Sequence, residues 1–151
     1  MFGDKAKKLV YIGSDHAGVK AKELLHTHLK EAGYDSTDLG TFTEEPCDYP
    51  DIAREVGEKV KEHDGSFGIL ICGTGIGMSM AANKLRGIRA AMVTDENMAE
   101  LSRKHNNANV ICMGARISTP EMITKMTDKF LTTTFDAEER HAKRVIKIDE
   151  M

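Results

Sequence analysis

The chain has 151 residues, of which 40% are hydrophobic and 30% charged, and its formal net charge at pH 7 is −3. This length allows one compact domain with a hydrophobic core, which we expect to span residues 1–151. The small negative charge argues against a nucleic-acid-binding protein, and no apolar stretch is long enough to span a membrane. The N-terminal segment lacks the apolar core of a signal peptide, so we expect a cytoplasmic protein without nucleic-acid or membrane partners.

The first half of the chain alternates between short apolar segments and helical patterns. Residues 8–13 are predicted to form a buried strand. A helix follows, indicated by the spacing of Ala21, Leu24, Leu25, Leu29 and Ala32. Gly33 is its expected C-cap, and residues 34–40 are a weaker strand candidate. Pro50 then opens a helix with its apolar residues on one face.

The second half continues the alternation. Residues 67–72 form the strongest strand candidate, and a helix rich in small residues follows over 77–85. A strand over 89–93, a helix over 95–105 and a strand over 109–114 come next. Ser118 and Glu121 form a capping box that predicts the start of another helix, with Pro120 in its first turn. The highly charged segment from about 136 to 149 is predicted to be the last helix.

Five strand–helix units with short connections predict a doubly wound, Rossmann-like α/β domain. Its five-stranded parallel sheet would carry helices on both faces. In such a fold, ligands bind beyond the carboxyl ends of the strands. This rule directs attention to the predicted strand exits, which are residues 14–18, 38–50, 72–79, 94–97 and 114–116.

One strand exit has the sequence CGTGIG, from Cys72 to Gly77. Closely spaced glycines let the backbone approach a ligand, and free N–H groups attract anions. The spacing fits neither a dinucleotide-binding fingerprint nor a P-loop nor a nucleophile elbow. A local field that favours the thiolate can make Cys72 a nucleophile or a base. The alternative reading is a tight turn in which Cys72 is a small core residue.

Other polar residues lie at or near strand ends. Asp15 and His16 follow the first strand and suit a sugar or phosphate ligand, although Asp15 also fits an N-cap. His105 ends a helix and precedes an Asn-rich turn. Paired arginines suit phosphate, and the candidates are Arg116 at a strand exit and Arg140 and Arg144 on one face of the last helix. A salt-bridged, exposed helix is the alternative for the last two.

The three cysteines, Cys47, Cys72 and Cys112, are odd in number and widely spaced. They contain no C-x-x-C pair, so we expect neither a disulfide framework nor a structural zinc site. Cys112 lies in the middle of a predicted strand and is expected in the core, and Cys47 is assigned no role.

Seven motifs occur in one order over roughly residues 10–145: GSDHAG, DYP, ILICGTGIG, GIRAA, HNNAN, MGAR and RHAKRV. Together they resemble the ribose-5-phosphate isomerase B family, whose wider group includes galactose-6-phosphate isomerases. Members interconvert an aldose phosphate and a ketose phosphate without metal or nucleotide, so the resemblance implies no cofactor. It also implies a homodimer, or a dimer of such dimers, with active sites at the interface and the C-terminal helix in the dimer contacts.

The resemblance assigns roles to residues of this chain. Cys72 would be the base that forms a cis-enediolate, Thr74 and the neighbouring N–H groups would stabilise the oxyanion, and His105 would assist ring opening. The implied substrate-binding residues are Asp15, His16, Tyr49, Gly73, Gly75, Ile76, Gly77, Ser79, Asn106, Arg116, Arg140 and Arg144.

Ribose 5-phosphate and ribulose 5-phosphate are the expected substrates, and the pentose phosphate pathway is the expected setting. The galactose-6-phosphate enzymes resemble two-chain assemblies that divide the motifs, whereas this chain keeps both Cys72 and His105. Two alternatives stay open. One is an isomerase of a six-carbon sugar phosphate, such as allose 6-phosphate or galactose 6-phosphate, and the other is a non-catalytic sugar-phosphate-binding module.

Overall fold

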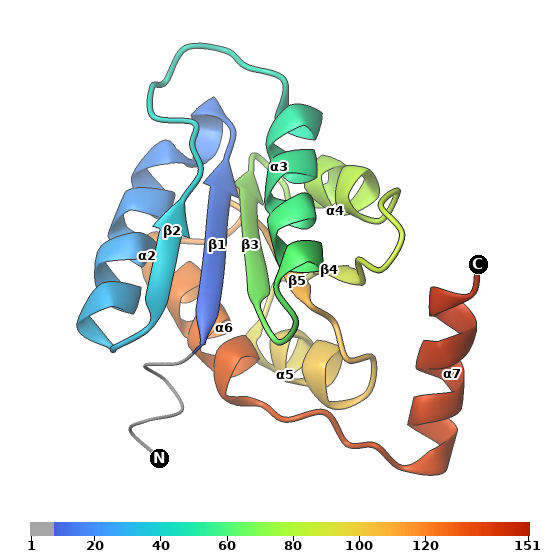
Figure 1. The fold of residues 1–151 in the computed structure, drawn as a ribbon. Coiled ribbons are helices and arrows are strands. Elements are labelled where there is room, and N and C mark those ends of the chain that lie inside the picture. Colours follow the sequence, from blue (N-terminus) through green and yellow to red (C-terminus); the bar gives the residue numbers. More distant parts are fainter. Residues whose placement is uncertain (1–7) are drawn as a thin grey trace.

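The computed structural model describes residues 8–151, which contain one five-stranded parallel sheet (Figure 1). The strands are β1 (Leu9–Ser14), β2 (Asp35–Asp38), β3 (Phe67–Cys72), β4 (Ala90–Met92) and β5 (Val110–Gly114). Their order in the sheet is β2-β1-β3-β5-β4, and all four pairings are parallel. The predicted doubly wound α/β fold is therefore confirmed.

Helices cover both faces of the sheet. The short 3-10 helix η1 (His16–Gly18) leads into α2 (Val19–Glu31), which packs on one face together with α5 (Glu96–Lys104) and α6 (Pro120–Thr132). Helices α3 (Tyr49–Glu62) and α4 (Ile76–Ala82) pack on the other face. The last helix, α7 (Glu139–Asp149), stands to the side of the sheet (Figure 1).

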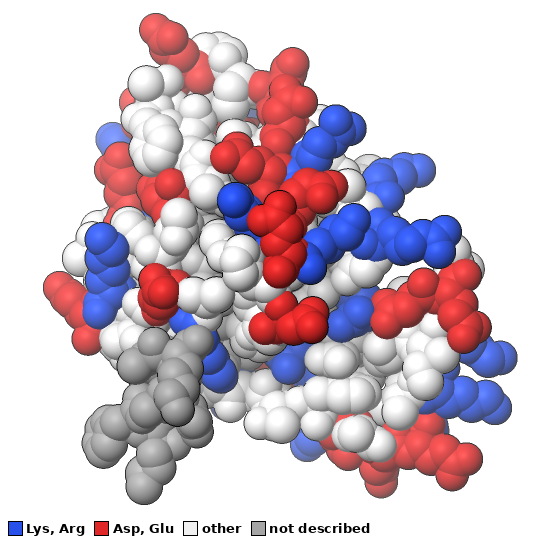
Figure 2. All heavy atoms as spheres, in the orientation of Figure 1, with Lys and Arg blue, Asp and Glu red and all other residues white. Residues whose placement is uncertain are grey.

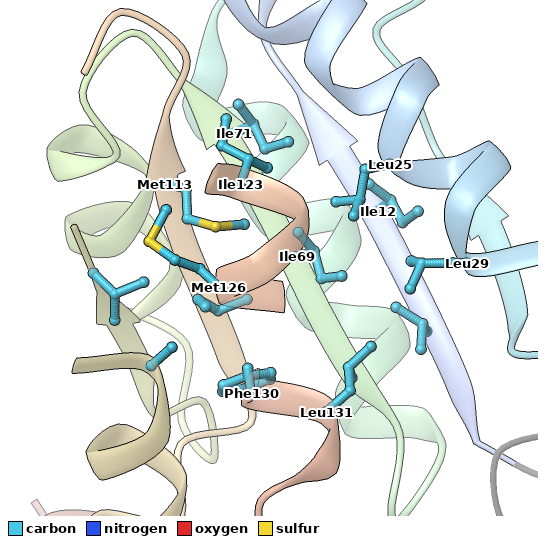
Figure 3. Packing of buried hydrophobic residues seen from close by; sticks show 14 of the residues in the cluster. Ile12, Leu25, Leu29, Ile69, Ile71, Met113, Ile123, Met126, Phe130 and Leu131 are labelled. Carbon is cyan, nitrogen blue, oxygen red and sulfur yellow. The ribbon is translucent and has the colours of Figure 1, made fainter. Parts of the chain in front are cut away.

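The core consists of two apolar layers, one on each face of the sheet. Strand β3 contributes to both layers because successive side chains point to opposite faces. Ile69 and Ile71 face α2 and α6, where Met113 and Phe130 also lie (Figure 3). Leu70 and Cys72 face α3 and α4. A central parallel strand is covered on both sides, which explains the continuous apolar run in its sequence.

Helix α2 differs from its prediction at one position. Leu24, placed on the apolar face by its spacing, is 57% exposed, whereas Leu25 and Leu29 are fully buried. Lys22 is fully buried as well, and its ammonium group contacts the carboxylate of Asp38 at 2.6 Å. The apolar stripe is therefore rotated toward Lys22, whose charge Asp38 balances.

The predicted capping box of α6 is wrong. Thr119, not Ser118, is the N-cap, and its hydroxyl accepts a hydrogen bond from the backbone N–H of Met122 at 3.2 Å. Pro120 does lie in the first turn. Helix α4 is shorter than predicted and ends at Ala82, because Gly87 and the residues before it form a turn.

The surface of the described residues carries mixed charge. Figure 2 shows acidic and basic side chains interspersed over one face, with no continuous basic area among its coloured residues. Within residues 8–151, every helix is too short or too polar to cross a membrane.

Candidate active site

Cys72 is the last residue of β3 and lies directly before the glycine-rich loop. Its side chain is largely buried, at 5% exposure, and its Sγ accepts a hydrogen bond from the backbone N–H of Gly75 at 3.1 Å. Gly75 has a φ of +86°, which favours glycine and turns its N–H back toward the sulfur. The loop is therefore shaped around Cys72, with the N–H of Gly75 directed at Sγ.

The same loop holds further donors. The Thr74 hydroxyl accepts the N–H of Ile76 at 3.2 Å, and the Ser79 hydroxyl donates to the carbonyl of Ile76 at 2.8 Å. Among the described residues, the N–H groups of Gly73, Thr74 and Gly77 have no hydrogen-bond partner. Of the N–H groups predicted as oxyanion donors, those of Gly75 and Ile76 are thus engaged within the loop, and the other three are free.

Asp15 and His16 lie beside this loop. The backbone N–H of Asp15 donates to the carbonyl of Ile71 at 3.1 Å, which ties the exit of β1 to the end of β3. Asp15 caps η1 by accepting the N–H of Ala17 at 2.9 Å, so both predicted roles of its carboxylate are compatible. The Nδ1 atom of His16 accepts the N–H of Cys47 at 3.3 Å. Cys47 therefore acts on His16 through its backbone, a contact that its sequence position did not indicate.

Two side chains close in on the glycines. A Cβ built on Gly77 would lie 2.7 Å from the hydroxyl of Tyr49, so the phenol of Tyr49 rests on the start of α4. A Cβ built on Gly73 would lie 3.2 Å from Nη1 of Arg116. The backbone N–H of Arg116 also donates to the carbonyl of Gly73 at 3.0 Å. Glycines at these two positions let a phenol and a guanidinium reach the loop.

Gly114, at the end of β5, makes a similar close approach. A Cβ at this position would lie 2.6 Å from the backbone of Thr74. Gly114 is paired with Cys72 in the sheet register, so the ends of β3 and β5 support the loop from both sides. Sequence reasoning gave Gly114 no role of its own, because a single glycine after a strand carries no signal of what it touches.

Cys112 is fully buried in β5, as predicted. Burial, and next the neighbouring Cys72, raise the pKa of its thiol far above the ordinary value. Cys112 is therefore held as a neutral thiol, and Cys72 is the cysteine that combines a strand exit with a backbone N–H donor.

His105 and Asn106 lie at the amino edge of the sheet, where the strands begin, whereas Cys72 lies at the carboxyl edge, where they end. His105 is the C-cap of α5, and Asn106 follows it in the turn that leads into the amino end of β5. Cys72 pairs with Gly114, the residue at the carboxyl end of β5. Five strand residues span roughly 13 Å, so one chain does not bring His105 and Cys72 together.

Helix α7 is held at the same edge as His105. The rings of His105 and His141 stack with their centroids 4.4 Å apart, and Asp149 forms an ion pair with Arg89 at 2.9 Å. Arg140 and Arg144 are exposed on this helix, and Nε of Arg140 lies 3.3 Å from Glu138. The pairing expected for an exposed charged helix is thus present for Arg140.

His141 is a site feature that sequence reasoning left without a role. It is 6% exposed, and its Nε2 has no hydrogen-bond partner among the described residues. This nitrogen lies 3.7 Å from a carboxylate oxygen of Glu138. The atoms of Asp136, Glu138 and His141 that could ligate a metal lie within 4.8 Å of one another, at α7 and not at the Cys72 loop.

Comparison with known proteins is consistent across sequence and structure. Residues 10–148 match the model of the ribose/galactose isomerase family. Ribose-5-phosphate isomerase B of Escherichia coli is 40% identical over 138 residues, which cover 91% of this chain and 92% of that protein. The chain belongs to the ribose/galactose isomerase family.

Two solved structures extend this result. The structure of ribose-5-phosphate isomerase B from Clostridium thermocellum matches with a TM-score of 0.91 and 44% identity, covering 94% of this chain and 95% of that one. The Mycoplasma genitalium ribose-5-phosphate isomerase B, solved with bound ribulose 5-phosphate, matches with a TM-score of 0.91 and 42% identity, covering 95% of each chain. The family resemblance inferred from the motifs is confirmed.

Proposed function

We propose that this isomerase interconverts D-ribose 5-phosphate and D-ribulose 5-phosphate. The observation that carries the proposal is the hydrogen bond from the N–H of Gly75 to Sγ of Cys72, at the exit of a central strand. Its relatives support the choice of substrate, because one of them was solved with ribulose 5-phosphate bound. The described geometry supports a base beside a set of free backbone donors.

In the proposed mechanism, the Cys72 thiolate removes the proton from C2 of the open-chain aldose. The electrons move into a C1–C2 double bond and the carbonyl oxygen O1 becomes an oxyanion, which the free N–H groups of Gly73, Thr74 and Gly77 and the hydroxyl of Thr74 stabilise. The Cys72 thiol then returns a proton to C1, and a proton passes from the O2 hydroxyl to O1. The product is the ketose, and the base is regenerated.

The remaining predicted residues bind the substrate in this proposal. Asp15, His16 and Tyr49 hold the sugar or its phosphate beside the Cys72 loop, with Gly75, Ile76 and Ser79 shaping the loop itself. Arg116, which contacts Gly73, supplies a positive charge at the same edge. Binding energy from the phosphate acts at a distance from the reacting carbons.

We further propose a homodimer in which His105 of the partner subunit opens the sugar ring. Asn106, Arg140 and Arg144 lie with His105 at the opposite edge of the sheet, so the partner would supply these groups as well. An exposed apolar surface beside the site supports this arrangement. Ile76 is 46% exposed and Met80 66% exposed, four residues apart on α4. No cofactor enters the proposal.

Conversion of ribose 5-phosphate by the purified protein in excess EDTA tests the function. We expect turnover by the wild type, loss of about 10²–10⁴-fold in kcat for Cys72→Ala, and no loss for the control Cys47→Ala. Full activity of Cys72→Ala would refute the assigned base. Binding of ribose 5-phosphate without turnover by the wild type would favour the binding-module alternative instead.

A six-carbon substrate is the second candidate, because the family model covers ribose and galactose isomerases. The ratio of kcat/KM for ribose 5-phosphate to that for allose 6-phosphate and for galactose 6-phosphate decides between them. A ratio above one supports the pentose phosphate, and a ratio below one supports the hexose phosphate.

A further inference from the structure

A cavity opens at the amino edge of the sheet, where the strands begin, away from the Cys72 loop. Its volume is about 480 Å³, which lies within the usual range for small-ligand pockets. It lies between the turn at Gly65 that follows α3, the turn at Gly87 that follows α4, and the end of α5. Four cationic side chains line it: Lys61, Arg86, Arg89 and Arg103. One carboxylate, that of the exposed Asp64, also lines it.

Arg103 is the buried member of this group, at 8% exposure. Its Nη1 donates to the side-chain oxygen of Asn107 at 2.8 Å and to the carbonyl of Ala108 at 2.7 Å, and its Nε donates to the carbonyl of Thr133 at 3.4 Å. The Phe67 ring lies 4.8 Å from the guanidinium carbon. All these partners are neutral, and Nη2 has no hydrogen bond to a described residue, so the positive charge of Arg103 is buried without a counter-charge among residues 8–151.

A second guanidinium is held close to Arg103. Nε of Arg89 donates to the carbonyl of Asn107 at 2.9 Å, so Asn107 binds both arginines. Burial, and then the charge of Arg89, lower the pKa of Arg103. Asp149 pairs with Arg89 from the side of α7 and neutralises one of the two charges.

The two exposed cations have no compensation of this kind. Within the described part of the chain, Lys61 and Arg86 form no ion pair and no side-chain hydrogen bond. After Asp149 and Asp64 are counted, the group keeps an excess of two positive charges. A buried unpaired charge is costly, and a bound anion removes that cost.

We propose that this cavity binds the phosphate group of a small anionic ligand. A phosphate dianion matches the excess charge of the cavity, and arginines donate to phosphate oxygens in pairs. Arg103 supplies the fixed, buried donor, and Arg86 and Lys61 close on the anion from the exposed rim. The proposal does not rest on the isomerase function, because the cavity lies at the edge of the sheet opposite Cys72, and neither His105 nor Asn106 lines it.

Amide NMR of the full chain, titrated with inorganic phosphate and separately with ribose 5-phosphate, tests the proposal. The reporters are the amides of Gly65 and Gly87, which line the cavity, against those of Gly73 and Gly77 at the Cys72 loop. The test variant is Lys61→Gln with Arg86→Gln, two exposed positions that form no ion pair with a described residue. Its control, Lys30→Gln with Lys125→Gln, makes the same charge change at exposed residues outside the cavity.

We expect saturable shifts at Gly65 and Gly87 whose Kd rises at least about tenfold in the test variant and is unchanged in the control. Both variants are expected to keep wild-type turnover of the sugar phosphate. Tighter binding of ribose 5-phosphate than of inorganic phosphate at these reporters would identify a phosphate ester as the ligand, and the reverse order would identify free phosphate. Shifts confined to Gly73 and Gly77, or an unchanged Kd in the test variant, would overturn the proposal. Absence of turnover in the wild type, together with saturable shifts at Gly65 and Gly87 that weaken in the test variant, would count only against the proposed function.

Discussion

The imidazole rings of His105 and His141 stack face to face, with centroids 4.4 Å apart and planes inclined by 10°. One ring ends α5 and the other lies on the first turn of α7. This stack, with the ion pair between Arg89 and Asp149, holds α7 at the edge of the sheet. The helix that carries Arg140 and Arg144 is thus positioned through the residue proposed to open the sugar ring.

His141→Ala is expected to loosen α7, because removing the ring takes away the stack. We expect faster hydrogen exchange of the α7 amides and a lower kcat/KM. His141→Phe keeps an aromatic ring and should keep α7 protected. Hydrogen exchange measured by mass spectrometry separates the two variants. Protection of α7 in His141→Ala equal to that in the wild type would contradict the role of the ring stack in holding α7.

Mixing two inactive variants tests the composite site. Cys72→Ala and His105→Ala are each expected to be inactive as homodimers. If each site takes Cys72 from one chain and His105 from the other, random exchange of subunits restores roughly a quarter of wild-type activity, because half of the dimers are mixed and each has one intact site of two.

The matched control for that experiment is Cys72→Ala mixed with Cys72→Ala/His105→Ala. No combination of these chains contains an intact site, so it should stay inactive. Activity that fails to recover when mixed dimers are shown to form would place both groups in one chain and contradict the proposed interface.

Gly114→Ala should damage the site while leaving the sheet intact. The new Cβ would lie 2.6 Å from the backbone of Thr74, so the loop after Cys72 must move. Displacements of about 1 Å in a catalytic group reduce rates by up to roughly 10²-fold, and we expect kcat/KM to fall by about 10–10²-fold.

The control for Gly114 is Gly33→Ala. Gly33 has a φ of +93° and open space where a Cβ would be, so alanine there should cost stability, by about 1 kcal/mol, and not activity. Steady-state kinetics together with urea unfolding measure both quantities. Unchanged kinetics in Gly114→Ala would show that the loop tolerates the shift.

Asp38→Asn is expected to destabilise the fold strongly. Lys22 is fully buried, and Asp38 is the carboxylate that balances it at 2.6 Å. Removing one partner of a buried pair costs about 3–5 kcal/mol. Asp128→Asn breaks the half-exposed pair with His28 and should cost less than about 1 kcal/mol. Urea unfolding at pH 7 measures both, and similar losses in the two variants would contradict this account.

Thiol labelling should distinguish the three cysteines. The thiolate is the reactive species, and burial raises the pKa of Cys112 far above its usual range. We expect a disulfide reagent to modify the half-buried Cys47 first, the largely buried Cys72 more slowly, and Cys112 only after unfolding. Ribose 5-phosphate should slow the labelling of Cys72. Mass spectrometry of peptides identifies each site, and modification of Cys112 in the folded protein would contradict this order.

The sequence predicted what depends on local patterns. The apolar run of β3 and the spacing of Leu25 and Leu29 identify a sheet with covering helices, because burial determines periodicity. The prediction from spacing was wrong at Leu24. Lys22 is buried instead, because Asp38 balances its charge. Asp38 lies outside the helix, so the local pattern does not reveal this pairing. The cap of α6 was misplaced by one residue, because Ser118 and Thr119 offer the same chemistry.

Some residues of the candidate site could likewise be predicted from local patterns, and others could not. Cys72, Asp15, His16 and Arg116 could be found from their places at strand exits, and the motifs added Tyr49. The support from Gly114 and the stack of His141 on His105 could not be predicted, because they join residues far apart in the chain. Nor does the order of motifs along the sequence reveal that His105 and Cys72 lie at opposite edges of the sheet.

The order of the strands has a consequence for how the protein reaches its active form. The three strand ends around the Cys72 loop belong to β1, β3 and β5, which are neighbours in the sheet but separated by long crossovers in the chain. Parallel pairings of this kind form slowly, because each closes a long loop before its contacts are made. Catalytic competence should therefore return on refolding only with the central strand pairings, later than the first helical signal, and no fragment of the chain that lacks one of these strands should carry it.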